Sequence, residues 1–207
     1  MEFSSIVTSE AELRSVLGHP SQRVLKKQLP ALDAHCRAFI ANSPFLLIAT
    51  ADAQGNLDIS PKGDPGGFAR VLDDTTLAIP DRPGNRRADT FGNLLQNPQI
   101  GLLFVIPGKQ ETLRVAGNAM IVRDHWLREQ MAIGGKLPDL ALVVKVREAF
   151  FHCAKCVIRS RLWDSGSWPD ATGLASLAQV IVDQAKPAES VEEMQAFLER
   201  DVRERLY

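Results

Sequence analysis

The sequence predicts a mainly β protein, an antiparallel β-barrel of about six strands with helices at both ends of the chain. Two observations predict this fold. From Phe45 onward the chain divides into short apolar segments separated by Gly, Asn and Asp turns, which is typical of hairpins. These segments also follow one another without the crossover helix that parallel pairing needs. Closing such a sheet into a barrel would remove its exposed edges.

The N-terminal segment, residues 1–43, is predicted to be helical. Ser9 and Glu12 have the spacing of a capping box, which predicts a helix from Glu10 to Leu17. Pro30 opens a second predicted helix, "PALDAHCRAFIAN". That helix ends at Ser43-Pro44, because a residue before proline avoids the helical conformation.

The barrel core is predicted between residues 44 and 151. Its most regular strand alternates, with Leu113, Val115, Gly117, Ala119 and Ile121 on one side. A helix from Ala88 to Gln96 interrupts the series of strands. The strand segments are "FLLIATAD", "GNLDIS", "GFARVLD", "TTLAIPD", "QIGLLFVIPG", "ETLRVAGNAMIVRD" and "LALVVKVREAFF".

The C-terminal segment, residues 152–207, is again predicted to be helical and to pack on the barrel within one overall domain. The stretches "ATGLASLAQVIVDQA" and "SVEEMQAFLERDVRERLY" are amphipathic. The second begins with a capping box formed by Ser190 and Glu193.

Composition limits the classes of function. The chain has 207 residues with 24 Lys and Arg against 25 Asp and Glu, which disfavours a general nucleic-acid binder. No apolar run approaches the roughly 20 residues of a membrane span. The start "MEFSSIVTSEAEL" lacks the features of a signal peptide, and three cysteines do not suggest a disulfide framework. We therefore expect a cytoplasmic protein.

The stretch "IPDRPGNRRADTF" concentrates Arg82, Arg86 and Arg87 on a turn. Gly84 and Asn85 tolerate the left-handed backbone that can point amides at one spot. The helix start that follows adds unpaired N–H groups, and arginine donates two parallel hydrogen bonds to phosphate. The pattern predicts a site for a phosphomonoester. Arginines that only solvate a loop near Asp81 and Asp89 are an equally open interpretation.

The stretch "LDISPKGDPGGF" places Ser60 and Lys62 at the end of a strand. A hydroxyl and an ammonium group are compatible with phosphate. The order of a P-loop is missing, and a solvated hairpin loop is the simpler interpretation.

Arg114 lies in the middle of an alternating strand. A charge on a sheet face is unfavourable unless it is solvated or paired. Its neighbours Thr112, Ala116 and Asn118 are small or polar, which would leave room for a flat ligand. A cross-strand salt bridge is the alternative interpretation.

"FHCAKC" contains Cys153 and Cys156 in a CxxC arrangement. The chain offers neither a second ligand pair for zinc nor the βαβ context of a redox motif, so no metal site is expected and half-buried helix cysteines are predicted. After them, "RSRLWDSGSW" brings Arg159 close to Trp163, a combination that suits a planar ligand or an interface. Alternatively, Trp163 fills one end of the barrel.

In order, "DISPKGDPGGF", "LAIPDRPGNRRADTFGNLLQNPQIGLLFVIPG" and "TLRVAGNAMI" resemble the pyridoxamine 5'-phosphate oxidase-like FMN-binding split-barrel family. The resemblance runs from about Pro44 to Trp163. It is nearest to a bacterial branch with a long helical N-terminal segment and a late "HCAK…RSRLW" element.

The resemblance implies a split barrel and a homodimer with FMN at the subunit interface. It implies that the strand ending in Ala78, Ile79 and Pro80 runs beside the flavin. The residues implied to bind the phosphate are Asn85, Arg86 and Arg87, assisted by Ser60 and Lys62; those implied to reach or close the ligand pocket are Arg114, Arg159 and Trp163.

The implied function is an FMN-dependent oxidoreductase that acts on a small molecule by hydride transfer. The full substrate-phosphate constellation of the oxidase is absent, so the substrate stays open. The alternative is a flavin carrier or sensor without turnover, or a protein for a haem-like ligand, because one fold serves several functions.

Overall fold

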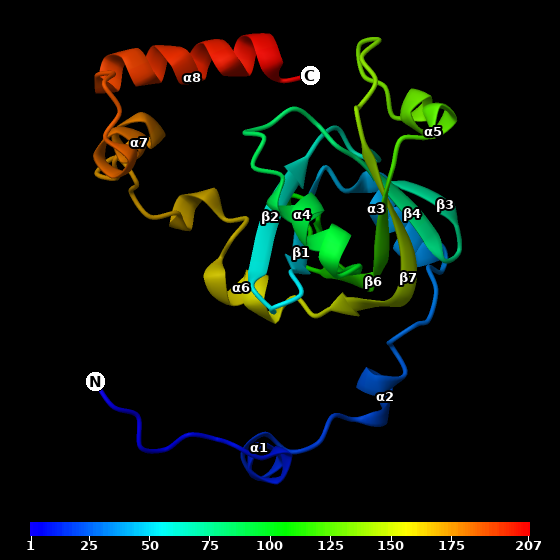
Figure 1. Ribbon diagram of the computed structural model, residues 1–207. Helices are drawn as coiled ribbons and strands as arrows, with labels where there is room; N and C mark the ends of the chain where they lie inside the picture. The colour runs from blue at the N-terminus through cyan, green and yellow to red at the C-terminus, as the bar shows by residue number, and fades with distance from the viewer.

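The computed structural model describes residues 1–207 and contains one seven-stranded antiparallel sheet that curls into a barrel (Figure 1). The spatial order of the strands is β2-β1-β5-β6-β7-β4-β3. Their bounds are β1 (Phe45–Ala51), β2 (Leu57–Gly63), β3 (Arg70–Asp73), β4 (Thr76–Pro80), β5 (Gln99–Val105), β6 (Thr112–Val122) and β7 (Ala141–His152).

The prediction of a mainly β, antiparallel split barrel with flanking helices is confirmed. All seven segments named from the sequence form strands, so the sheet has seven strands and not six. The shortest of them is β3, which has four residues and pairs only with β4. The edge strands β2 and β3 do not pair with each other, which leaves the barrel split.

The core is built from the inward faces of the strands. On β6 the predicted alternation is confirmed, with Leu113 and Val115 fully buried and Arg114 exposed. At Gly117 the register of β6 and β7 shifts, and a Cβ atom there would lie 2.1 Å from the carbonyl oxygen of Lys145. Glycine is therefore required where these two strands approach most closely.

Helices cover the barrel and extend from both of its ends. None of the residues of α1, α2 or α8 is buried, whereas α3 places Cys36 and Ile40 in the core. The bounds are α1 (Glu10–Leu17), α2 (Gln22–Leu25), α3 (Ala34–Asn42), α4 (Asp89–Gln96), α5 (His125–Gln130), α6 (Lys155–Ser160), the 3-10 helix η1 (Ser165–Ser167), α7 (Leu177–Ala185) and α8 (Val191–Arg205).

The helix predicted from Pro30 begins later, at Ala34. The side chain of Asp33 accepts a hydrogen bond from the N–H of Cys36 at 2.8 Å and caps α3. Residues 30–33 form bends and irregular structure, directly after Leu29, which makes an isolated antiparallel bridge with Ala149. The capping interactions of Ser9 in α1 and of Ser190 with Glu193 in α8 are as predicted.

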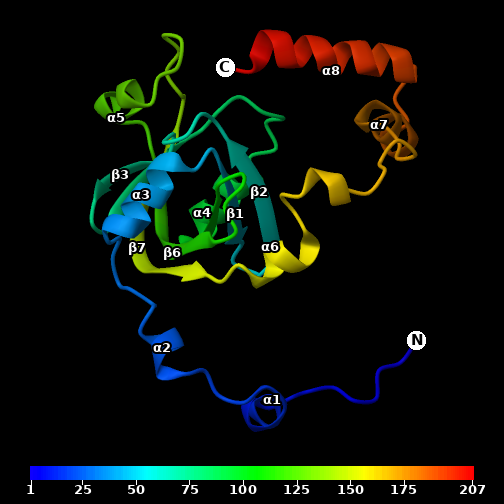
Figure 2. The ribbon, with the colours of Figure 1, turned by 180° about the vertical axis from the view of Figure 1, so that it is seen from behind.

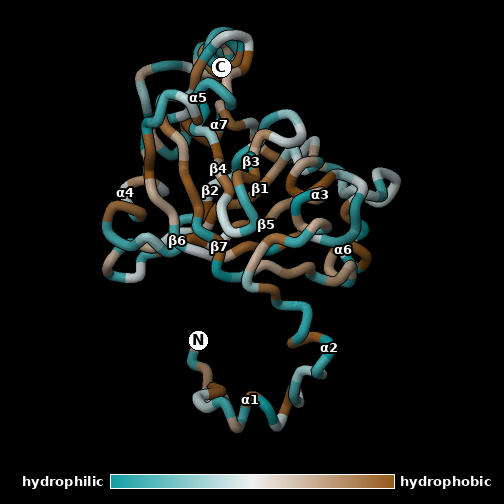
Figure 3. Tube along the Cα trace, turned by 90° about the vertical axis from the view of Figure 1, so that its right-hand side faces the viewer, coloured by the Kyte–Doolittle hydropathy of each residue, from teal (hydrophilic) through white to brown (hydrophobic).

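The two ends of the chain lie outside the barrel on different sides. Figure 2 shows α1 and α2 on one side and α7 and α8 on another. Figure 3 shows the N-terminal segment as a mixed polar and apolar stretch away from the body of the molecule. No helix has the length and apolar character needed to span a bilayer. The division at residues 43 and 152 stays a prediction, and α3 packs into the barrel core.

Candidate functional site

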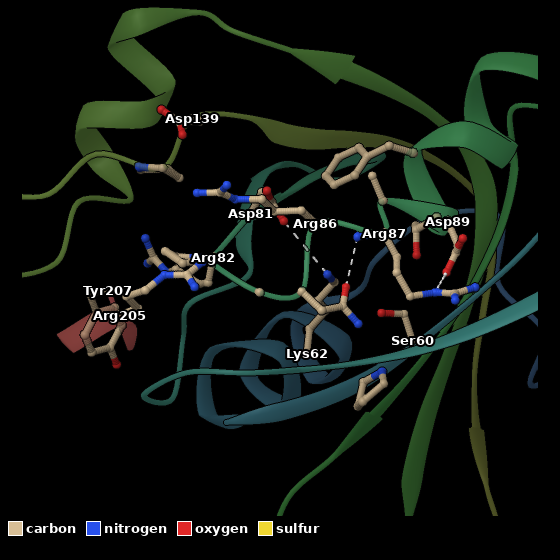
Figure 4. A pocket seen from close by; sticks show the side chains of 18 of the residues that line it. Ser60, Lys62, Asp81, Arg82, Arg86, Arg87, Asp89, Asp139, Arg205 and Tyr207 are labelled. Carbon is tan, nitrogen blue, oxygen red and sulfur yellow. Dashed lines mark hydrogen bonds and ion pairs between the residues drawn. The ribbon is translucent and has the colours of Figure 1, made fainter. Parts of the chain in front are cut away.

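A cavity of about 840 Å³ opens where several distant segments meet. Its lining comes from β2, the loop after β4, the start of α4, residues 136–139 and the residues at the end of α8. This volume lies within the range of roughly 300–1,000 Å³ typical of small-molecule sites. Figure 4 shows the charged side chains that surround the space.

The loop between β4 and α4 has an unusual backbone. Arg86 (φ 62°) and Ala88 (φ 58°) are both left-handed although neither is glycine. The side-chain oxygen of Asn85 accepts a hydrogen bond from the N–H of Arg87 at 3.0 Å, which fixes the turn. Such strained residues cost of order 1–3 kcal/mol each and tend to cluster at functional sites.

Helix α4 begins inside this cavity without a side-chain cap. Ala88 occupies the N-cap position and cannot accept from the first N–H groups, while Asp89 and Thr90 of the first turn line the cavity. Free N–H groups and the positive end of the helix dipole favour an anion at this point. The uncapped helix start therefore fits a phosphate group.

Three cations of the predicted phosphate site line the cavity, and they differ in their partners. Lys62 of β2 lies 3.9 Å from Asp81, and Arg87 donates to Asp89 at 2.7 Å. Arg86 forms no ion pair and no side-chain hydrogen bond within the chain. Its guanidinium is the most available donor for a ligand.

Asp81 also lines the cavity, and sequence reasoning did not select it as a functional residue. Burial raises the pKa of its carboxyl above the ordinary value, while the nearby Lys62 acts in the opposite direction. Its position in the sequence could have identified it, because Asp81 directly precedes the arginine turn.

The sequence left the role of Arg82 open, and the structure gives it a local partner. Its Nε donates to Asp64 at 2.6 Å, and its Nη2 donates to the carbonyl oxygen of Met131 at 2.9 Å. The Asp64 side chain is completely buried. Arg82 therefore ties the loop after β4 to the β2–β3 connection and to the end of α5.

The structure brings together five of the predicted binding residues, Ser60, Lys62, Asn85, Arg86 and Arg87, at the cavity. Six others lie elsewhere in the chain. Ala78, Ile79 and Pro80 are buried within β4, directly before the loop. Arg114, Arg159 and Trp163 are not among the lining residues.

Arg114 has partners on its own sheet. It forms a salt bridge with Glu148 of β7, and its guanidinium lies 4.1 Å from the ring centroid of Phe150. This is the cross-strand alternative raised from the sequence. Trp163 donates from Nε1 to the carbonyl oxygen of Lys109 at 2.6 Å, while Arg159 is exposed on α6.

The prediction of half-buried cysteines in the CxxC segment is wrong. Cys153 and Cys156 are both exposed, and Cys153 precedes α6. A hydrogen bond from the N–H of Lys155 lowers the pKa of the Cys153 thiol. The short α6 has one buried residue, Val157, so the neighbouring cysteines stay in solvent. No group of three or more His, Cys, Asp or Glu side chains is placed to hold a metal ion.

The pyridoxamine 5'-phosphate oxidase family model matches residues 32–153, which include all seven strands and the arginine loop. A comparison with curated proteins found no match.

Solved structures of low sequence identity resemble part of the chain. HupZ of Group A Streptococcus is 23% identical, with 57% of this chain and 92% of HupZ covered and a TM-score of 0.47. HutZ, a haem storage protein from Vibrio cholerae, is 19% identical, with coverage of 58% and 93% and a TM-score of 0.39. A pyridoxamine 5'-phosphate oxidase-related, FMN-binding protein from Nostoc punctiforme is 16% identical, with coverage of 56% and 78% and a TM-score of 0.38.

Proposed function

Because the chain belongs to the pyridoxamine 5'-phosphate oxidase family, we propose that it binds FMN in this cavity and acts as a flavin-dependent oxidoreductase on a small molecule. The observation that carries the proposal is the loop at residues 81–88. This loop directs an unpaired Arg86 and an uncapped helix start toward the same cavity.

The donors in this loop fit the phosphate end of FMN. A phosphomonoester has three strong acceptor oxygens, which match guanidinium and backbone N–H donors. Arg86 supplies unpaired donors, and Arg87 and Lys62 add positive charge at the same rim. The left-handed Arg86 and Ala88 hold this rim in place before the ligand arrives. The expected roles of Asn85 and Ser60 are to fix the turn and to contribute a hydroxyl.

When bound, FMN supplies hydride transfer, and the protein contributes binding, orientation and charge. Lys62 places a cation in the cavity, which favours an anionic form of a bound ring. The carboxylate of Asp81 lies 3.9 Å from this ammonium group and offsets part of the positive charge in the cavity. These two side chains would set the electrostatic environment of the cavity.

We propose that a second copy of the chain completes the site. Ile59 lines the cavity and yet is 67% exposed, and Leu57 on the same edge strand is 79% exposed. Apolar side chains in such a position favour a partner surface over solvent. In the dimer, the partner copy would supply Arg114, Arg159 and Trp163, which lie outside the cavity of their own chain.

The absorption spectrum of the purified protein and of its acid extract tests the proposed function. The expected result is a flavin spectrum and the release of FMN. A colourless protein that gains no thermal stability from added FMN contradicts the proposal, since a ligand that binds the folded state must stabilise it. A haem spectrum in place of flavin bands would likewise contradict it.

A second experiment separates an enzyme from a carrier or sensor. The bound flavin of an oxidoreductase should be reduced by NAD(P)H or another donor and reoxidised by an acceptor. Flavin that stays oxidised with every donor tested would favour the carrier.

A further inference from the structure

Helix α8 is joined to the barrel at one end. Figure 1 shows it lying apart from the strands, with the end of the chain turned toward the barrel. The hydrogen bonds between residues 191–207 and the barrel region are both made by Tyr207. Because α8 has no buried residue, its contact with the barrel can open when the bonds of Tyr207 are released.

The attachment lies at the wall of the cavity. The hydroxyl of Tyr207 donates to Oδ1 of Asp64 at 2.9 Å, and Lys136 donates to the carbonyl oxygen of Tyr207 at 2.7 Å. The guanidinium of Arg82 lies 5.8 Å from the centroid of the Tyr207 ring. Tyr207 thus contacts both members of the Asp64–Arg82 ion pair. Figure 4 shows it beside Arg82.

The residues around this attachment line the same cavity as the arginine loop. Glu204, Arg205 and Tyr207 form part of its wall, next to the 136–139 loop, whose Lys136 donates to Tyr207. The cavity is therefore bounded on one side by the arginine loop and on another by a segment whose two hydrogen bonds to the barrel region are both made by Tyr207. The arginine loop is suited to binding a ligand in a fixed position, and the C-terminal segment is suited to opening the cavity.

We propose that Glu204, Arg205 and Tyr207 form a gate on the cavity, held closed by the Tyr207–Asp64 hydrogen bond with the Lys136 bond beside it, and that small molecules reach the bound cofactor when the bond to Asp64 opens. The identity of those molecules as substrates rests on the proposed function, whereas the attachment and its release do not. Tyr207 acts here as a positioning residue.

The gate has a direct spectroscopic reporter, because Tyr207 is the single tyrosine of the chain. The hydrogen bond to Asp64 raises the pKa of its phenol above 10, and Arg82 acts in the opposite direction. Lys136, Glu204 and Arg205 are the other charged groups around it. A phenolate cannot donate to the Asp64 carboxylate and is repelled by it, so the gate should open as pH rises through the native pKa.

The experiment compares wild type with Tyr207→Phe, which keeps the ring and removes the donor. Leu206→Ala is the matched control, since Leu206 is an exposed neighbour outside the cavity lining. We expect hydrogen exchange in residues 191–207 to become about tenfold faster in Tyr207→Phe and to stay unchanged in Leu206→Ala. The phenol absorbance at alkaline pH should titrate at a higher pH in native wild type than in urea.

Iodide quenching of the bound flavin measures access to the cavity, and it should increase in Tyr207→Phe alone. Unchanged hydrogen exchange together with an ordinary phenol titration would show that Tyr207 does not hold the segment on the barrel. Faster exchange with unchanged quenching would overturn the gate. A wild type that binds no FMN would instead refute the proposed function, and the exchange and titration results would still decide whether Tyr207 holds the segment.

Discussion

Arg82 donates to Asp64 at 2.6 Å, and this pair joins two loops that approach the cavity from different strands. The Asp64 side chain has no solvent exposure and that of Arg82 has 16%. Arg82 therefore differs from Arg86, which is exposed and unpaired although it lies only four positions further along the same loop. Two arginines of one motif have separate physical roles.

Removing Arg82 should destabilise the fold. Arg82→Ala leaves a buried carboxylate without its partner, and loss of one partner of a buried pair costs about 3–5 kcal/mol. Urea unfolding measures this loss as a lower transition midpoint. Arg86→Ala is the matched control and should unfold close to wild type, so equal midpoints for wild type and Arg82→Ala would refute the structural role.

Removing Arg86 should weaken cofactor binding without this loss of stability. We expect Arg86→Ala to reduce the free energy of FMN binding by about 1.5–3 kcal/mol, the scale of a hydrogen bond to a charged group. Fluorescence titration with FMN measures the change. Arg23→Ala on α2, far along the chain from the cavity, should bind FMN as wild type does, and unchanged affinity of the Arg86 variant would exclude Arg86 from the site.

The raised pKa of Asp81 makes a prediction about pH. A carboxyl with a native pKa above its unfolded value of 3.8 opposes folding when it is charged, and this effect disappears as pH falls below both values. Asp81→Asn should therefore be more stable than wild type at neutral pH, by less than about 1 kcal/mol in view of the Lys62 that it leaves unpaired. The difference should shrink in acid. Thermal unfolding across this pH range measures it, and a variant that is less stable at neutral pH would show that the ion pair with Lys62 outweighs burial.

The three cysteines should react in two classes. Cys153 and Cys156 are exposed, whereas Cys36 is buried and its pKa is raised by burial to about 11. A thiol reagent should modify two groups in the native protein and the third only after unfolding. The double variant Cys153→Ser, Cys156→Ser should keep FMN affinity, and a form unable to bind flavin would assign the pair to the site.

The parts of the fold that follow from local pattern could be predicted. Short apolar segments between Gly, Asn and Asp turns located the strands, and Ser9 and Ser190 located two helix starts, because these signals involve residues close in sequence. The start of α3 was placed too early, because Leu29, directly before Pro30, is held in a bridge with Ala149 and the helix begins only after the Asp33 cap. A long-range bridge of this kind leaves no mark on the local pattern.

The candidate site, too, could be predicted only where its residues are close in sequence. The arginine loop was found because its turn residues, cations and helix start are contiguous. The pairing of Arg82 with Asp64, 18 positions earlier, and the approach of Tyr207 from 143 positions away depend on tertiary packing. The expected roles of Arg114, Arg159 and Trp163 at the ligand stay predictions.

The central claim is that the loop at residues 81–88 grips the phosphate of FMN, and a comparison of FMN with riboflavin tests it most directly. The two ligands differ only in the phosphate group. Wild type should bind FMN at least about tenfold more tightly than riboflavin, and Arg86→Ala should lose most of that preference while its riboflavin affinity stays the same. Equal affinities of wild type for the two ligands, or an unchanged preference in the variant, would contradict the claim.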